Sequence, residues 1–177
     1  MKKVIIFVLT ALSFTGCKSN EAESVLNDVN NPKVIMSLGS NNLSFDEPSI
    51  FYQFFNQTYS KYQNSYIAIY SSNMNSYMNI SFIADKLTPK VTSAKINGKD
   101  LFLGIELKTN FNNIPEVWYN DDNSKTTTDN IEITDFEYRD KGKIRGVINT
   151  TMIGQSGTNK GKRINAKIEF VGRYTAS

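Results

Sequence analysis

The sequence has no histidine and a single cysteine, Cys17, in 177 residues. The absence of histidine excludes Ser-His-Asp and Cys-His catalysis, histidine-ligated metal sites and imidazole pH switches. With one cysteine, no disulfide can form within the chain. A folded domain must therefore be held together by its hydrophobic core, and a chain of this length is long enough to build one.

The chain also lacks an excess of charge of one sign. It carries 20 Lys and Arg against 17 Asp and Glu. Lys2 and Lys3 lie in a segment that we expect to be removed, which leaves 18 basic side chains against 17 acidic ones. Binding of nucleic acid requires a basic face that neutralises phosphates, so we expect no nucleic-acid partner.

The N-terminal segment has the organisation of a bacterial export signal. Lys2 and Lys3 precede the apolar run Val4–Leu12, which is too short to span a bilayer, since a spanning helix takes about 20 residues. Small residues then lead to Cys17, as a signal peptidase requires. The stretch Phe14-Thr15-Gly16-Cys17 resembles the lipobox of bacterial lipoproteins, with Phe14 in place of the usual leucine.

This resemblance implies cleavage before Cys17 and acylation of its thiol, which would anchor the protein in a membrane. Lys18 stands where an Asp would resemble an inner-membrane retention signal, so we expect the outer membrane, on either its periplasmic or its surface face. An ordinary secretory signal that precedes a cysteine is the alternative. We expect a signal peptide over 1–16, a lipidated flexible tether over 17–32, and one β-rich domain over 33–177.

Alternation of apolar and polar residues with period two predicts a mainly β domain. Many short strands joined by turns favour an antiparallel β-sandwich or a barrel-like sheet. Between Ile131 and Tyr138 the apolar face switches sides, which predicts a β-bulge near Thr134–Asp135. The expected strands are Val34–Leu38, Tyr66–Tyr70, Met78–Ile83, Val91–Ile96, Leu101–Leu107, Val117–Asn120, Ile131–Tyr138, Ile144–Met152 and Arg163–Tyr174.

Turn residues separate several of these strands. Asn97-Gly98 predicts a tight hairpin between the strands that flank it, and Asp140–Gly142 predicts a second one. The Gly-rich stretch Gly154–Lys162 is typical of a longer, flexible hairpin loop. Its glycines match neither a phosphate-binding loop nor a nucleophile elbow at Ser156.

One segment has the spacing of a helix. Ile50, Phe54, Phe55 and further aromatic residues recur at helical intervals, with Asp46 as a possible cap. This pattern predicts a short helix over 47–62 that packs across the sheet. Aromatic-rich strands are the alternative interpretation.

Trp118, Tyr119, Asp121 and Asp122 are the candidate contacts to a glycan or a protein partner. Exposed aromatic rings beside carboxylates can stack on a sugar and bind its hydroxyl groups. The alternative is that Trp118 anchors the core at the end of a strand, as a lone tryptophan usually does.

The same loop contains oxygen-bearing side chains that could bind calcium. Asp121, Asp122, Asn123 and Asp129 are the possible ligands, but their spacing does not fit an EF-hand, and a solvated loop is the simpler interpretation. No spacing places two carboxylates across a cleft, as a glycosidase requires. We therefore expect no metal, no cofactor and no catalytic activity.

The C-terminal stretch carries a resemblance to a family. The segment IEITDFEYRDKGKIRGVINTTM, which begins at Ile131, is followed by a Gly-rich loop and KRINAKIEFVGRY. This arrangement resembles the last three strands of small β-sandwich lipoproteins of Bacteroidetes. The resemblance implies a sandwich fold and attachment to the outer membrane, and it supplies no active site.

Two classes of function follow from these observations. The first is an anchored lipoprotein with a non-catalytic binding or structural role at the cell envelope, which predicts an exposed aromatic patch or an unpaired sheet edge. The alternative is a carrier of a small apolar ligand, which predicts a β-barrel cavity lined by the inward residues of the last strand. A carboxylate-dependent, glycan-active enzyme is the third possibility.

Overall fold

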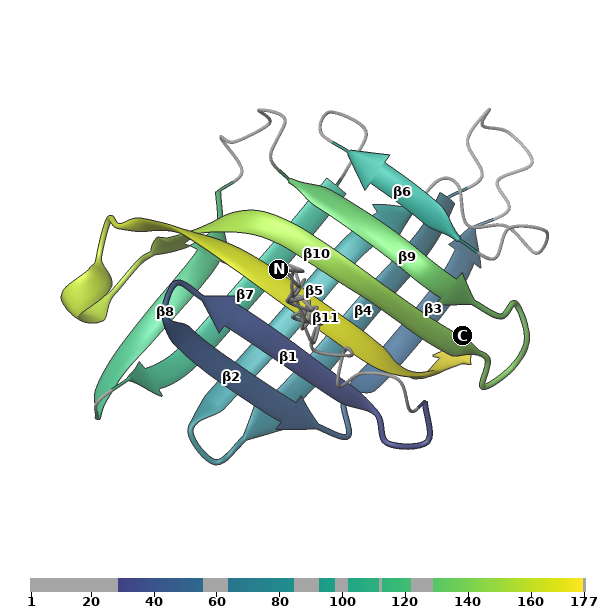
Figure 1. Ribbon diagram of the computed structural model, residues 1–177, viewed down its shortest axis with the longest axis horizontal. Helices are drawn as coiled ribbons and strands as arrows, with labels where there is room; N and C mark the ends of the chain where they lie inside the picture. The colour runs from purple at the N-terminus through teal and green to yellow at the C-terminus, as the bar shows by residue number, and fades with distance from the viewer. Residues whose placement is uncertain are drawn as a thin grey trace, which may run out of the picture.

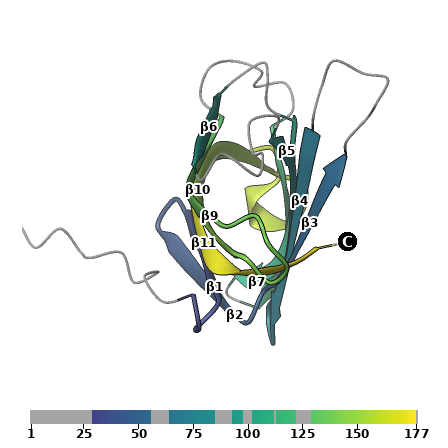
Figure 2. The same cartoon turned by 90° about the vertical axis from the view of Figure 1, so that its right-hand side faces the viewer.

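Apart from the short 3-10 helix η3 (Gly157–Asn159), the described part of the domain consists of β-strands arranged in two facing layers, as the alternation in the sequence predicts (Figures 1 and 2). The computed structural model describes residues 29–55, 64–84, 93–97, 102–111, 113–121 and 129–176. The expected signal peptide and most of the expected tether lie outside these ranges. Within them, no helix has the length and hydropathy of a membrane-spanning segment.

The strands belong to two layers that are visible in Figure 1. The front layer has the order β2-β1-β11-β10-β9-β6, and the rear layer has the order β3-β4-β5-β7-β8. The strands are β1 (Lys33–Leu38), β2 (Asn41–Asp46), β3 (Ser49–Phe55), β4 (Asn64–Asn73), β5 (Ser76–Ala84), β6 (Ala94–Asn97), β7 (Phe102–Phe111), β8 (Ile114–Asn120), β9 (Asn130–Phe136), β10 (Lys143–Gly154) and β11 (Arg163–Ala176).

Backbone pairing between strands joins the two layers at two places. At one, residues 174–176 of β11 leave the front layer and pair with residues 50–52 of β3 in the rear layer. At the other, residues 152–154 of β10 pair with residues 118–120 of β8. The result is a sandwich whose layers form one continuous, barrel-like sheet. Every named strand pair is antiparallel except β11 with β3, so the antiparallel prediction fails at that pair alone.

The core lies between the layers and is built from the alternating inward residues of the strands. In β10, buried and half-buried residues alternate from Lys143 to Gly154 without interruption. Phe82 of the rear layer and Phe170 of the front layer meet across the sandwich, with ring centroids 6.3 Å apart. Burying a side chain of this size contributes about 1.5–3 kcal/mol relative to leaving it exposed, so the core is a large source of the stability of the sandwich.

The helix expected over 47–62 is wrong where the structure describes it. After β2 the chain turns at Glu47, which has a positive φ of 53°, and enters β3 at Ser49. In β3, Ile50 and Tyr52 are buried whereas Phe51 is exposed, which is the period of a strand. Pairing with both β4 and β11 outweighs the helical spacing of the aromatic residues. Residues 56–62 lie outside the described ranges.

The bulge expected near Thr134–Asp135 is confirmed. Arg145 of β10 is paired with Asp135, and the next residue, Gly146, is paired with Ile133, so Thr134 is the extra residue of β9. The bulge lets Ile133 and Phe136 both face the core.

The turns are partly as expected. The Asp140–Gly142 turn joins β9 to β10, and Lys141 has the positive φ of 54° that such a turn uses. The hairpin expected at Asn97-Gly98 is wrong, because β6 pairs with β9 in the front layer whereas β7 pairs with β5 and β8 in the rear layer. β6 and β7 therefore belong to different layers, and Gly98 lies outside the described residues.

Candidate functional site

Of the four contact residues expected from the sequence, Trp118 belongs to the core. Its side chain is 1 % exposed, and its indole N–H donates to Oε2 of Glu116 at 3.1 Å. The interpretation that it anchors the end of a strand is confirmed, and stacking of Trp118 on a sugar is excluded. The neighbouring Tyr119 points the other way, and its side chain is 42 % exposed.

Asp121 is also buried, and it is held by an ion pair. Nε of Arg163 lies 2.8 Å from Oδ2 of Asp121, which links the residue after β8 to the start of β11. This contact occupies the carboxylate that the sequence suggested for a partner or a calcium ion. Asp122 and Asn123 lie outside the described residues. In the ranges that the structure describes, no three His, Cys, Asp or Glu side chains gather as a metal site requires.

The loop between β10 and β11 is fixed to β8 by the buried carboxylate of Glu116. Oε1 of Glu116 accepts hydrogen bonds from Oγ1 of Thr158 at 2.9 Å and from Nδ2 of Asn159 at 2.8 Å. The backbone N–H of Val117 donates to Oγ of Ser156 at 3.0 Å. The loop over 154–162 is therefore anchored to β8, and the expectation that it is flexible is wrong. Because its carboxylate is surrounded by donors from the protein, Glu116 has a structural role.

The surface that stands out is the outward side of the rear layer. Four aromatic side chains from four strands are exposed there: Phe51 by 42 %, Tyr70 by 38 %, Tyr77 by 36 % and Tyr119 by 42 %. Strand register places polar residues of β5 and β7 between them. We call this surface the outer aromatic face, and it consists of Phe51, Tyr70, Tyr77, Asn79, Glu106, Lys108 and Tyr119.

Four of these side chains form one row across four neighbouring strands. Tyr70 of β4 is paired with Asn79 of β5, Asn79 with Glu106 of β7, and Glu106 with Tyr119 of β8. The two tyrosines are separated by three strand spacings, or about 14 Å. The row thus has a ring at each end and hydrogen-bonding groups in the middle.

The polar groups of the face are held by one another. Nζ of Lys108 lies 3.0 Å from Oε1 of Glu106, and the hydroxyl of Tyr119 donates to the same oxygen at 3.3 Å. The ammonium also lies 5.9 Å from the centroid of the Tyr77 ring, within reach of a cation–π contact. The hydrogen bond to Glu106 raises the pKa of Lys108, so the ammonium stays charged at neutral pH.

A hollow of about 380 Å³ adjoins this face at the turn between β4 and β5. Tyr77 and Lys108 belong both to the outer aromatic face and to the lining of the hollow. Other lining residues include Ser72, Asn73, Asn75 and Asn110. The turn is held in shape because Nδ2 of Asn73 donates to the carbonyl of Ser44 at 3.1 Å, while its Oδ1 accepts from the N–H of Asn75 at 3.0 Å. Hydroxyl, amide, ammonium and aromatic groups therefore converge at one place.

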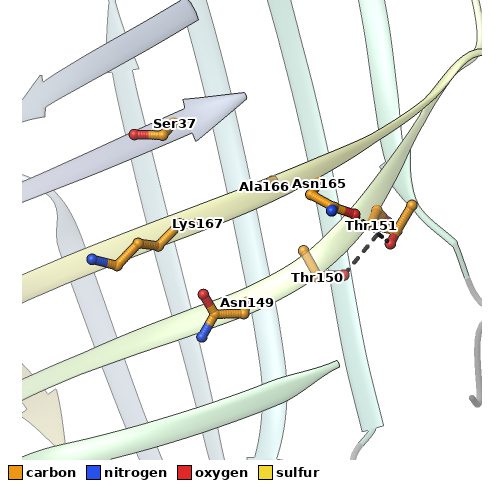
Figure 3. A pocket seen from close by; sticks show the side chains of 7 residues that line it. All are labelled: Ser37, Asn149, Thr150, Thr151, Asn165, Ala166 and Lys167. Carbon is orange, nitrogen blue, oxygen red and sulfur yellow. Dashed lines mark hydrogen bonds between the residues drawn. The ribbon is translucent and has the colours of Figure 1, made fainter. Parts of the chain in front are cut away.

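A second hollow, of about 320 Å³, lies on the front layer (Figure 3). It is lined by residues of β1, β10 and β11, among them Ser37, Asn149, Asn165 and Lys167. No aromatic side chain is among its lining residues, and Nζ of Lys167 is engaged by Glu169 at 2.6 Å. This hollow offers hydrogen bonds without a ring to stack on, so the outer aromatic face is the stronger candidate.

The sequence identified Tyr119 but not the rest of the face. Tyr70, Tyr77, Glu106 and Lys108 occupy the outward positions of strands whose inward positions were recognised as apolar. In the sequence, these residues stand at the polar positions that alternate with the apolar, inward ones. What the sequence did not provide was the strand order, which brings β4, β5, β7 and β8 side by side.

Comparison of the chain with models of known protein families, with curated proteins and with solved structures finds no match.

Proposed function

We propose that this protein is a lipoprotein of the cell envelope that binds a partner, without catalysis, through the outer aromatic face. The acyl chains on Cys17 would tether the domain to the outer membrane. The observation that carries the binding role is the exposure of Phe51, Tyr70, Tyr77 and Tyr119 on one side of the rear layer. Aromatic side chains dominate the energetics of binding surfaces, and four of them on one sheet face favour a recognition role.

The tether would leave the domain at a defined place. Pro32 precedes β1, and its carbonyl accepts a hydrogen bond from the N–H of Glu47 at 3.0 Å. Oδ1 of Asn30 accepts from Arg173 at 3.4 Å. The last residues of the expected tether thus already contact the domain. They join it through β1, a strand of the front layer, which leaves the outward side of the rear layer accessible to a partner.

The packing of the last strand favours this proposal over a carrier of apolar ligands. A carrier would need the inward side chains of β11 to line a cavity. Ile168 and Phe170 are fully buried in the core, and Phe170 meets Phe82 of the opposite layer. Tyr174 of the same strand stacks on Phe136, with ring centroids 5.6 Å apart. The inward side chains of β11 thus pack against other core residues, whereas in a carrier they would line a cavity for the ligand.

The anchoring part is tested by mass spectrometry of the protein purified from membranes. We expect a mature N-terminus at Cys17 that carries a diacylglyceryl group, and we expect the protein in the outer-membrane fraction. The Cys17→Ala variant is expected to lose the lipid and to leave that fraction. An unmodified Cys17 in the native protein, or a native protein found in the soluble fraction, would refute the anchor.

The binding part is tested in intact cells with a photoreactive phenylalanine derivative, which keeps an aromatic ring, introduced at position 77 on the outer aromatic face. We expect this chain to form a covalent adduct with an envelope component. The same photoreactive side chain at position 149, on the front layer, is the matched control and is expected to give no such adduct. Equal labelling from the two positions would contradict a specific role of the outer aromatic face.

A further inference from the structure

We propose that the ligand of the outer aromatic face is a neutral glycan, with one sugar seated in the hollow beside Tyr77 and the chain extending over the row that ends at Tyr119. This inference rests on the proposed function and gives it a ligand class. It is carried by three features: the chemistry of the hollow, the pairing of the charges and the arrangement of the row.

The hollow offers what a sugar ring needs. One side of a pyranose is lined with C–H groups that pack on an aromatic ring, and its rim carries hydroxyl groups that both donate and accept hydrogen bonds. Tyr77 supplies the ring, and Ser72, Asn75 and Asn110 supply hydroxyl and amide groups that can do both. Because the two bonds of Asn73 hold the turn in shape, little conformational entropy is lost when a ligand enters.

The charges of the face favour a neutral ligand. Lys108 and Glu106 neutralise each other at 3.0 Å, and the hydroxyl of Tyr119 satisfies Glu106 further. An anionic ligand would compete with Glu106 for Lys108, and a cationic ligand would compete with Lys108 for Glu106. Hydroxyl groups can add hydrogen bonds to the pair without breaking it.

The row favours an extended chain over a protein partner. A protein interface has an apolar centre and a polar rim. The row has the opposite order, with Asn79 and Glu106 in the middle and Tyr70 and Tyr119 at the ends. Rings about 14 Å apart suit separate units of a linear saccharide, whose hydroxyl groups reach the polar middle.

The test is affinity electrophoresis of the full-length protein in native gels that contain a polysaccharide. The neutral probes are mannan, laminarin, xylan and dextran, and the acidic comparison is alginate. We expect at least one neutral probe to retard the protein and alginate to retard it less. Loss of one stacking ring is expected to weaken the affinity about tenfold in Tyr77→Ala and in Tyr119→Ala. Asn149→Ala, in the hollow of the front layer, is the matched control and is expected to bind like the native protein.

Thermal unfolding checks that each variant is folded. If Tyr119→Ala is not folded, Tyr119→Leu is used in its place. Failure of every neutral probe to retard the protein overturns the inference, as does retardation that survives both tyrosine substitutions. The photoreactive chain at position 77 separates this failure from that of the proposed function. A protein adduct without retardation overturns the glycan and leaves the binding role standing, whereas neither adduct nor retardation overturns both.

Discussion

The hydroxyl of Tyr174 donates a 2.6 Å hydrogen bond to the carbonyl of Glu137 and accepts one of 2.9 Å from the backbone N–H of Arg139. One side chain of β11 thereby satisfies two backbone groups at the turn between β9 and β10. The backbone N–H of Tyr174 also donates to the carbonyl of Gly142, at the end of the same turn. The turn and the last strand are held as one unit, although they lie far apart in the sequence.

Replacing Tyr174 with phenylalanine tests this unit. The variant keeps the ring in the core but removes both hydrogen bonds of the hydroxyl, while the N–H of Arg139 keeps its 3.0 Å bond to the carbonyl of Glu137. We expect Tyr174→Phe to lower the free energy of unfolding by about 0.5–1.5 kcal/mol, measured by urea denaturation. Tyr70→Phe, whose ring is exposed, is the control and should change it by less than about 0.5 kcal/mol. Equal effects of the two substitutions would contradict the assigned role.

The buried hydroxyl of Tyr52 predicts a loss of stability at high pH. Burial raises the pKa of Tyr52 to about 12, although its 2.9 Å hydrogen bond with Ser65 works in the opposite direction. In the unfolded chain a tyrosine ionises near pH 10. The stabilisation is thus complete below pH 10 and is lost as the pH rises through about 12, because the unfolded state releases its proton first.

Over this pH window the contribution of Tyr52 amounts to about 2–3 kcal/mol. We expect urea denaturation between pH 9 and pH 12 to show this decrease in the native protein. Tyr52→Phe cannot ionise, so its free energy of unfolding should fall less steeply over the same range. A variant that follows the native slope would show that another group causes the decrease.

Gly146 lies at the β-bulge and has no room for a side chain. A Cβ atom at this position would lie 2.5 Å from Cζ of Phe170 and 2.9 Å from the carbonyl oxygen of Glu132. We therefore expect Gly146→Ala to destabilise the protein by about 1–3 kcal/mol, since the core ring or the strand must move. Gly104→Ala is the comparison, because its Cβ would meet only Ser81 closely. A lower melting temperature for Gly104→Ala than for Gly146→Ala would contradict the prediction.

Glu116 predicts a local effect on the loop between β10 and β11. In Glu116→Gln, one acceptor oxygen becomes an NH₂ group that opposes the donors of Trp118, Thr158 or Asn159. We expect a loss of about 1–3 kcal/mol and faster hydrogen exchange of the loop amides over 157–162. Glu132→Gln, at an exposed position of β9, serves as the control. Unchanged exchange in the loop would show that Glu116 does not hold it.

The strands could be predicted from the sequence because their alternation directly records which side is buried. β10 and β11 are the clearest cases, and the bulge at Thr134 was visible as a change of face. The segment after Asp46 was predicted wrongly, because aromatic residues on both faces of β3 leave no clean period. Phe51 is tolerated on the outward side since it packs edge-on against Tyr70, with ring centroids 5.8 Å apart.

The candidate site was predictable only in part for a different reason. Trp118 and Tyr119 are adjacent in the sequence, but neighbours in a strand point to opposite sides, so only one of them can be exposed. Glu106 and Lys108 lie on β7, which is next to β8 in the sequence, but Tyr77 lies on β5 and joins Tyr119 only through the order of the strands. A pattern that repeats within one strand contains no information about its neighbours.

β11 pairs with β1 and β10 in one layer and with β3 in the other. The hydrophobic core between the two layers therefore cannot be completed until residues 163–176 have been synthesised and can pair with their neighbouring strands. Contacts between such distant parts of a chain form slowly, because a large loop must close first. If the chain is exported as we propose, this delay would help to keep it open while it passes through a translocon.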